Sequence, residues 1–77
     1  MMINTVELTS NMNSVFQHTV ERTIERLKNG DYVPRKLGAS LYVYFATTTM
    51  RIVINGTTAY VFTDYFSYDR YLESIGK

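Results

Sequence analysis

The sequence contains no cysteine, no tryptophan, one proline and one histidine in 77 residues. Without cysteine the chain can form neither a disulfide nor a thiolate metal site, and this absence suits a reducing cytoplasm. The lone histidine, His18, has no second imidazole with which to complete a structural zinc site, which needs about four ligands. We therefore expect a fold held together by its core alone, with no metal and no cofactor.

Long apolar runs and a strong net charge are also lacking. The longest apolar run, Leu41 to Ala46, is far shorter than the ~20 residues that span a membrane, and the first residues lack the pattern of a signal peptide. The formal net charge of +1 is too small for the long-range attraction expected of a protein that coats DNA. These absences predict a soluble, cytoplasmic protein without a membrane partner.

The residues that are present have the composition of a globular chain. Hydrophobic residues make up 45% of the sequence and charged residues 19%, which predicts one domain over residues 1–77 rather than a disordered tail. Seven tyrosines and four phenylalanines are more rings than so small a core requires. We expect some of these rings to lie at the surface.

A β-hairpin is predicted around Asn55-Gly56. This pair is typical of a type I′ turn, in which both central residues need φ > 0, and β-branched and aromatic residues flank it on both sides. A two-residue turn sets the register of the two strands. Ile54 is then expected to oppose Thr57, Ile52 to oppose Ala59, Met50 to oppose Val61, Arg51 to oppose Tyr60 and Thr49 to oppose Phe62.

A third strand is predicted from Leu41 to Ala46, because its residues alternate in type. Leu41, Val43 and Phe45 are apolar, and the tyrosines Tyr42 and Tyr44 lie between them. A turn of two or four residues at Thr47-Thr48 would pair Phe45 with Met50. Leu41, Val43 and Phe45 would then join the aliphatic face of the hairpin, and Tyr42 and Tyr44 would lie on the opposite face. The prediction is a three-stranded antiparallel meander.

Two helices are expected to flank the meander. Residues 14–29 carry an apolar stripe at Phe16, Val20, Ile24 and Leu27, begin with a capping-box pattern at Ser14 and end at Gly30. Residues 67–75 form a shorter amphipathic segment. Residues 31–40 are expected to form an exposed basic loop, and residues 1–10 to form either an edge strand or an extended arm. The predicted fold is α+β, a small two-layer sandwich in α-β-β-β-α order.

No catalytic pattern is found. His18 lies at helical spacing from Glu21 and Glu25, which is typical of a solvated helix face, and nothing in the sequence places a third group to activate Thr19. Asp64 and Asp69 lie around the start of the last helix, where carboxylates commonly gather. We therefore predict that the protein is not an enzyme.

The aromatic face of the predicted sheet is the strongest candidate for a binding site. It carries Tyr42, Tyr44, Arg51, Tyr60 and Phe62, and the expected register aligns Tyr44, Arg51 and Tyr60 in one row. Tyrosine and arginine are enriched at the energetic centres of protein interfaces. If open, this face would bind another protein or pair two copies of the chain as a homodimer. Alternatively, the last helix covers it with Tyr68 and Leu72.

Two functions follow from this face. In the first, the protein is a small non-enzymatic protein-binding module that acts as an inhibitor or regulator by occupying the surface of a partner protein. In the second, it binds nucleic acid, with Tyr44 and Tyr60 stacking bases while Arg51, Arg35 and Lys36 hold phosphates. The near-neutral charge favours the protein partner.

Overall fold

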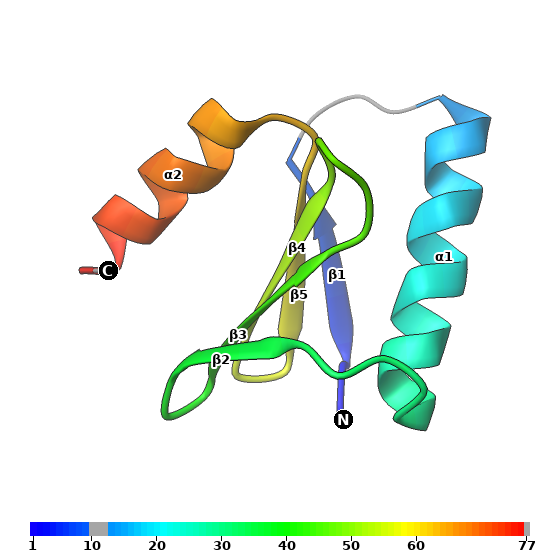
Figure 1. Ribbon diagram of the computed structural model, residues 1–77, viewed down its shortest axis with the longest axis horizontal. Helices are drawn as coiled ribbons and strands as arrows, with labels where there is room; N and C mark the ends of the chain where they lie inside the picture. The colour runs from blue at the N-terminus through cyan, green and yellow to red at the C-terminus, as the bar shows by residue number, and fades with distance from the viewer. Residues whose placement is uncertain (10–12, 77) are drawn as a thin grey trace.

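The computed structural model describes residues 1–9 and 13–76, which form three layers (Figure 1). Helix α1 (Ser14–Asn29) covers one face of a central sheet and helix α2 (Tyr65–Ser74) covers the other. The strands are β1 (Thr5–Leu8), β2 (Arg35–Gly38), β3 (Leu41–Phe45), β4 (Arg51–Asn55) and β5 (Thr58–Phe62). The α+β class is confirmed, whereas the two-layer arrangement with a three-stranded meander is wrong.

The sheet has five strands in the order β1-β5-β4-β3-β2. β1 runs parallel to β5, and every other pair of neighbours is antiparallel. The strand alternative for residues 1–10 is therefore confirmed for Thr5–Leu8, while Ser10 lies outside the described residues. β1 and β2 occupy the two edges of the predicted meander.

β2 lies in the segment that the sequence predicted as a loop. Arg35 opposes Val43 and Lys36 opposes Tyr42, with an irregularity in the register before Gly38. The segment lacks apolar alternation, which concealed the strand. A charged edge strand is nevertheless stable, because only one side of its backbone needs a partner and charged side chains discourage further pairing.

The hairpin between β4 and β5 is confirmed, but its register differs from the prediction by two residues. Asn55 opposes Thr58 and Ile52 opposes Val61. Gly56 has φ 65°, and no residue other than glycine has a positive φ in the described ranges, so Asn55 does not take part in a type I′ turn. Gly56 instead takes the first central position of the turn, as a type II′ turn requires. A shift of two residues leaves the facing of every side chain unchanged.

Replacing Gly56 with alanine should lower the free energy of unfolding by about 1 to 2 kcal/mol. A Cβ at this position would meet no atom of the described residues within 4 Å, so the loss comes from the left-handed backbone alone. Urea unfolding would measure it, with Gly56→Asn as the control because asparagine tolerates this conformation better. Equal stability of the alanine and wild-type proteins would contradict the requirement for a positive φ.

The β3–β4 pairing differs from the prediction by one residue. This difference is an inversion of β3, because it turns every side chain of the strand to the opposite face of the sheet. Phe45 opposes Arg51, so the connection holds an odd number of residues, 46–50. The Ala46 amide donates to the Met50 carbonyl at 3.0 Å, and the Met50 amide donates to Oγ1 of Thr47 at 2.9 Å. These bonds fix a loop of this length, which buries Met50 against the α1 side of the sheet.

The inversion divides the apolar residues between two cores. On the α1 side, Val20, Ile24 and Leu27 of the helix pack with a set from the N-terminal segment, the loop and the sheet: Ile3, Met50, Ile52, Ile54, Ala59 and Val61. On the α2 side, buried Tyr68 packs with Leu41, Val43, Val53 and Phe62. Phe16 and Phe45, which the sequence placed in a single core, are exposed.

The starts of both helices are set by polar side chains that precede the predicted starts. The Asn13 side chain, rather than Ser14, caps α1 by accepting the Phe16 amide at 3.0 Å. Asp64 caps α2 by accepting the Ser67 amide at 2.7 Å, so α2 begins at Tyr65 instead of Ser67. Gly30, with φ 81°, ends α1 as predicted. Neither helix of the described part is long and apolar enough to cross a membrane.

Candidate functional site

The predicted row of Tyr44, Arg51 and Tyr60 is not formed. Tyr44 opposes Ile52, which places it on the α1 face, and Tyr60 opposes Val53. Arg51 instead lies between Phe45 of β3 and Phe62 of β5 on the α2 face. The sheet therefore does carry an arginine flanked by two rings, but both rings differ from those predicted.

Arg51 is held among three aromatic rings. Its Cζ lies 5.0 Å from the ring centroid of Phe45, 5.2 Å from that of Tyr65 and 5.4 Å from that of Tyr68. Contacts of this kind contribute about 0.5 to 2 kcal/mol each, more where water is excluded. We call Phe45, Arg51, Phe62, Tyr65 and Tyr68 the Arg51 aromatic cluster.

The hydrogen bonding of Arg51 is incomplete. Nη1 donates to the Thr49 carbonyl at 3.2 Å, whereas Nε is buried without an acceptor among the described residues. In residues 1–9 and 13–76 the ion pairs join His18 to Glu21 and Arg26 to Asp31, and none includes Arg51. The guanidinium is thus a half-buried cation without an acidic partner in the described chain.

Helix α2 supplies two rings of the cluster. The Asp64 cap starts the helix so that Tyr65 and Tyr68, three residues apart, share one face. Tyr68 is buried, and its ring centroid lies 6.3 Å from those of Phe45 and Phe62, in edge-on contact with both. Burial raises the pKa of Tyr68 although the charge of Arg51 opposes the shift, so the phenol is neutral over the physiological range.

The cluster is open to solvent on one side. Phe45 is 57% exposed and Tyr65 is 61% exposed, while Phe62 and Tyr68 are buried beneath them. The open side therefore presents the rings of Phe45 and Tyr65 next to the half-buried Arg51. This arrangement can hold an apolar group against the exposed rings together with a carboxylate or a carbonyl oxygen at the guanidinium.

The structure brings together two of the seven predicted site residues, Arg51 and Phe62. Tyr42 and Tyr44 are half-buried on the α1 face, where Tyr44 stacks on Tyr32 with ring centroids 5.0 Å apart and planes 9° from parallel. Tyr60 lies on the α2 face against Tyr71, with centroids 4.9 Å apart. The electrostatic influence of Tyr71, followed by burial, raises the pKa of Tyr60.

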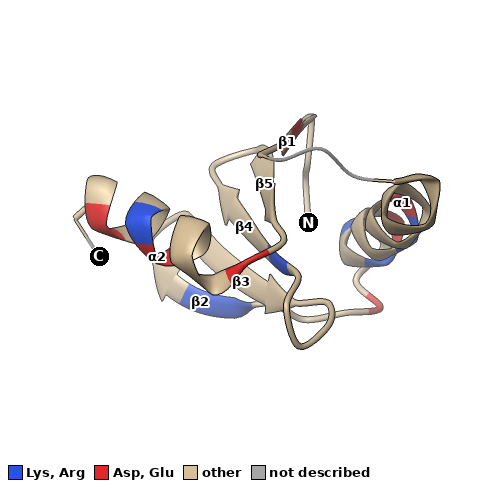
Figure 2. Ribbon diagram, turned by 90° about the horizontal axis from the view of Figure 1, so that it is seen from above, with Lys and Arg blue, Asp and Glu red and all other residues tan. Residues whose placement is uncertain are grey.

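The two basic residues of the predicted site do not form a common patch. Arg35 and Lys36 are exposed neighbours in β2, and because consecutive side chains of a strand alternate, they project to opposite faces of the sheet. Figure 2 shows these basic residues on β2, at the edge of the sheet. Only Arg35 therefore shares a face with Arg51.

The polar residues considered for catalysis take separate positions. Nδ1 of His18 lies 4.0 Å from Oε2 of Glu21, and both side chains are largely exposed. Asp64 is occupied by Ser67, whose amide and hydroxyl both donate to it. Across the described ranges, no group of three or more histidine, aspartate and glutamate side chains is placed to hold a metal ion.

Sequence reasoning missed Phe45 and Tyr65 as members of the site, and it named Tyr68 only in the alternative in which the last helix covers the aromatic face. Phe45 was placed in the core by the assumed even length of the loop after it, and Tyr65 was placed before the last helix. A usable signal for Tyr65 was present: aspartate is as good a helix cap as serine, and a cap at Asp64 puts Tyr65 and Tyr68 on one helix face.

No protein-family model matches the sequence, and neither curated proteins nor solved structures provide a match. The chemistry of the Arg51 aromatic cluster is therefore the basis on which a function can be assigned.

Proposed function

We propose that the protein is a non-enzymatic binding module that regulates another protein by occupying its surface through the Arg51 aromatic cluster. The observation that carries this proposal is the pair of exposed rings, Phe45 and Tyr65, with centroids 5.0 and 5.2 Å from Cζ of Arg51, whose guanidinium has no acidic partner in the described chain. A partner that covers the rings would remove apolar surface from water and place a hydrogen-bond acceptor against the exposed part of the half-buried guanidinium.

The cluster is suited to binding because its parts are already ordered. Arg51 is fixed by its position in β4 and by the bond to Thr49, and Phe45 is fixed by the adjacent strand. Tyr65 is held at the first turn of α2 by the Asp64 cap. A surface that needs little ordering loses less conformational entropy on binding, and its aromatic and arginine side chains are those that dominate interface energies.

A protein partner is better supported than nucleic acid. The nucleic-acid alternative depends on Tyr44 and Tyr60 stacking bases on one surface, whereas the sheet separates them to opposite faces. The phosphate contacts assigned to Arg35 and Lys36 are divided in the same way. The net charge of +1 adds no general attraction for a polyanion.

The double variant Phe45→Ala/Tyr65→Ala tests the proposal. Affinity capture with the wild-type protein would supply the partner, and calorimetric titration of that purified partner should show an affinity loss of about 10-fold or more in the double variant. Phe16→Ala is the matched control, since Phe16 is also an exposed ring but lies on α1, across the sheet from the cluster.

Two results would contradict the proposal. One is a double variant that keeps full affinity for the partner while its thermal melt shows an intact fold. The other is saturable binding of a single-stranded or duplex oligonucleotide at moderate salt, with shifts in the NMR signals of Phe45, Arg51 and Tyr65, because that would assign the cluster to nucleic acid.

A further inference from the structure

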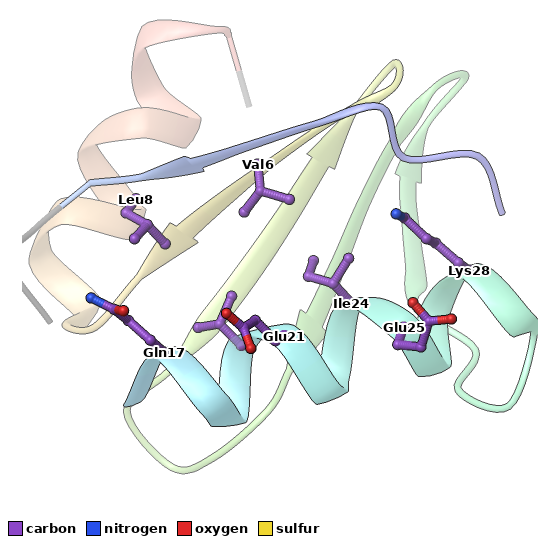
Figure 3. Close-up of a pocket in the computed structure, with 8 residues that line it drawn as sticks. Val6, Leu8, Gln17, Glu21, Ile24, Glu25 and Lys28 are labelled. Atoms are coloured by element: carbon purple, nitrogen blue, oxygen red, sulfur yellow. The ribbon is translucent and has the colours of Figure 1, made fainter. Parts of the chain in front are cut away.

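A groove lies between β1 and α1, on the face of the sheet opposite to the Arg51 aromatic cluster (Figure 3). Its volume is about 470 Å³, and its apolar lining comes from Val6 and Leu8 of β1 with Val20 and Ile24 of α1. Val6 is 41% exposed and Leu8 is 45% exposed. Figure 3 shows both side chains directed from the strand towards the helix, so the groove leaves aliphatic surface uncovered.

The backbone beside this groove is a sheet edge to which no further strand of the described residues is paired. β1 is the outermost strand on its side, with β5 as its neighbour. The amides of Thr5 and Thr9 donate to the carbonyls of Thr57 and Val61, at 3.4 and 3.2 Å. Since alternate residues of a strand direct their backbone groups to opposite edges, the amides and carbonyls of Val6 and Leu8 point away from β5, where an added strand would bond to them.

The helical wall of the groove is acidic along its middle. Glu21 and Glu25 line it one turn apart, and Lys28 follows at the end where the N-terminal amino group donates to the Lys28 carbonyl at 3.3 Å. Within the described ranges Glu25 forms no ion pair, and Glu21 meets only the exposed His18 at 4.0 Å. Both carboxylates are therefore available to a cation that enters the groove.

The spacing of these carboxylates matches that of side chains on an extended chain. Four residues of helix advance about 6 Å, and two residues of strand advance about 6.6 Å. Basic side chains at positions i and i+2 of an added strand would thus meet Glu21 and Glu25 together. Their methylene stems would cover Val6 and Leu8 on the way, as lysine and arginine stems commonly do on apolar surface.

We propose that β1 and α1 form a second binding surface, which takes an extended basic segment of a partner protein as an added β-strand. The segment bonds through its backbone to Val6 and Leu8 and places alternate lysine or arginine side chains in the groove against Glu21 and Glu25. This surface lies across the sheet from the Arg51 aromatic cluster. An experiment can therefore disprove binding at one site and leave the proposal for the other site unaffected.

A synthetic peptide tests this surface directly. The probe is acetyl-Thr-Val-Thr-Arg-Thr-Arg-Thr-amide, in which the arginines stand two residues apart. On titration into the full chain, the NMR signals of Val6, Leu8, Glu21 and Glu25 should shift, and hydrogen exchange of the Val6 and Leu8 amides should slow at least threefold. Glu21→Gln and Glu25→Gln should each weaken binding about 3-fold, since a single exposed ion pair contributes little to the binding free energy. Glu73→Gln on α2 should leave it unchanged.

Two control peptides isolate the features of the probe. The isomer with adjacent arginines, acetyl-Thr-Val-Thr-Thr-Arg-Arg-Thr-amide, should bind at least 3-fold more weakly, and the peptide with glutamate for arginine should not bind. The proposal is overturned by no binding of the probe, by equal binding of the isomer, or by shifts that map outside the groove. Concentration-dependent dimerisation that protects the Val6 and Leu8 amides would also overturn it, because a second copy would then be the occupant.

Discussion

Val53→Asp is expected to unfold the protein. Val53 is fully buried and packs with Leu41, Val43 and Tyr68 between the sheet and α2. Burial of an unpaired carboxylate costs several kcal/mol, which is comparable to the whole stability of a domain of this size. Circular dichroism at 25 °C should show loss of the cooperative thermal transition, and the same substitution at exposed Val33 should leave the transition within about 2 °C of wild type.

The substitution also distinguishes three layers from two. In a two-layer sandwich only one of two consecutive strand residues faces the core, so Ile52 would be intolerant of aspartate and Val53 would accept it. Here Ile52 faces α1 and Val53 faces α2, and both are fully buried. Both aspartate variants should therefore unfold, and a Val53→Asp protein that melts cooperatively at the wild-type temperature would show that α2 does not cover the sheet.

Tyr68→Ala is expected to destabilise the protein by about 3 to 5 kcal/mol, the usual cost of removing a buried ring. The ring is the one buried side chain of α2, and it contacts Phe45, Phe62 and Tyr65 of the Arg51 aromatic cluster. Chemical denaturation would measure the loss. In this variant, hydrogen exchange should also show that α2 opens more readily than α1, since the core between α1 and the other face of the sheet is unchanged.

The matched control is Tyr68→Phe, which keeps the ring and removes the titrating hydroxyl. Because burial raises the pKa of Tyr68, its contribution to stability is complete below pH 10, the usual value, and is lost as the pH rises through the folded-state pKa. Tyr68→Phe should thus be near wild type at pH 7 and lose less stability above pH 10. A Tyr68→Ala protein within 1 kcal/mol of wild type would contradict the assigned packing of α2.

The parts of the fold that could be predicted from the sequence are those in which a local signal determines the outcome. The Asn55-Gly56 hairpin, the apolar stripe of α1 and its end at Gly30 are of this kind. The facing of Ile52 and Ile54 was also correct, because a shift of two residues in register does not change it.

The parts that could not be predicted depend on pairing at a distance or on loop length. The three threonines at 47–49 give no indication of whether the β3–β4 connection is odd or even, and the bonds to Met50 decide it. β2 forms because β3 is available beside it. The sequence left open whether the last helix covers a sheet face, and the alternative in which it does so with Tyr68 and Leu72 is confirmed. For the candidate site, Arg51 and Phe62 were identified from the sequence. Phe45 could be placed in the site only if the β3–β4 connection was known to hold an odd number of residues.

The parallel pairing of β1 with β5 has a consequence for the order in which the chain folds. Thr9, just after β1, and Val61 in β5 are hydrogen-bonded although they are 52 residues apart in the chain. During synthesis β1 leaves the ribosome long before its neighbour exists, and antiparallel hairpins from β2 to β5 can form first because their contacts are local. Addition of β1 then closes a loop that contains nearly every other element, so we expect it to be among the last steps of folding.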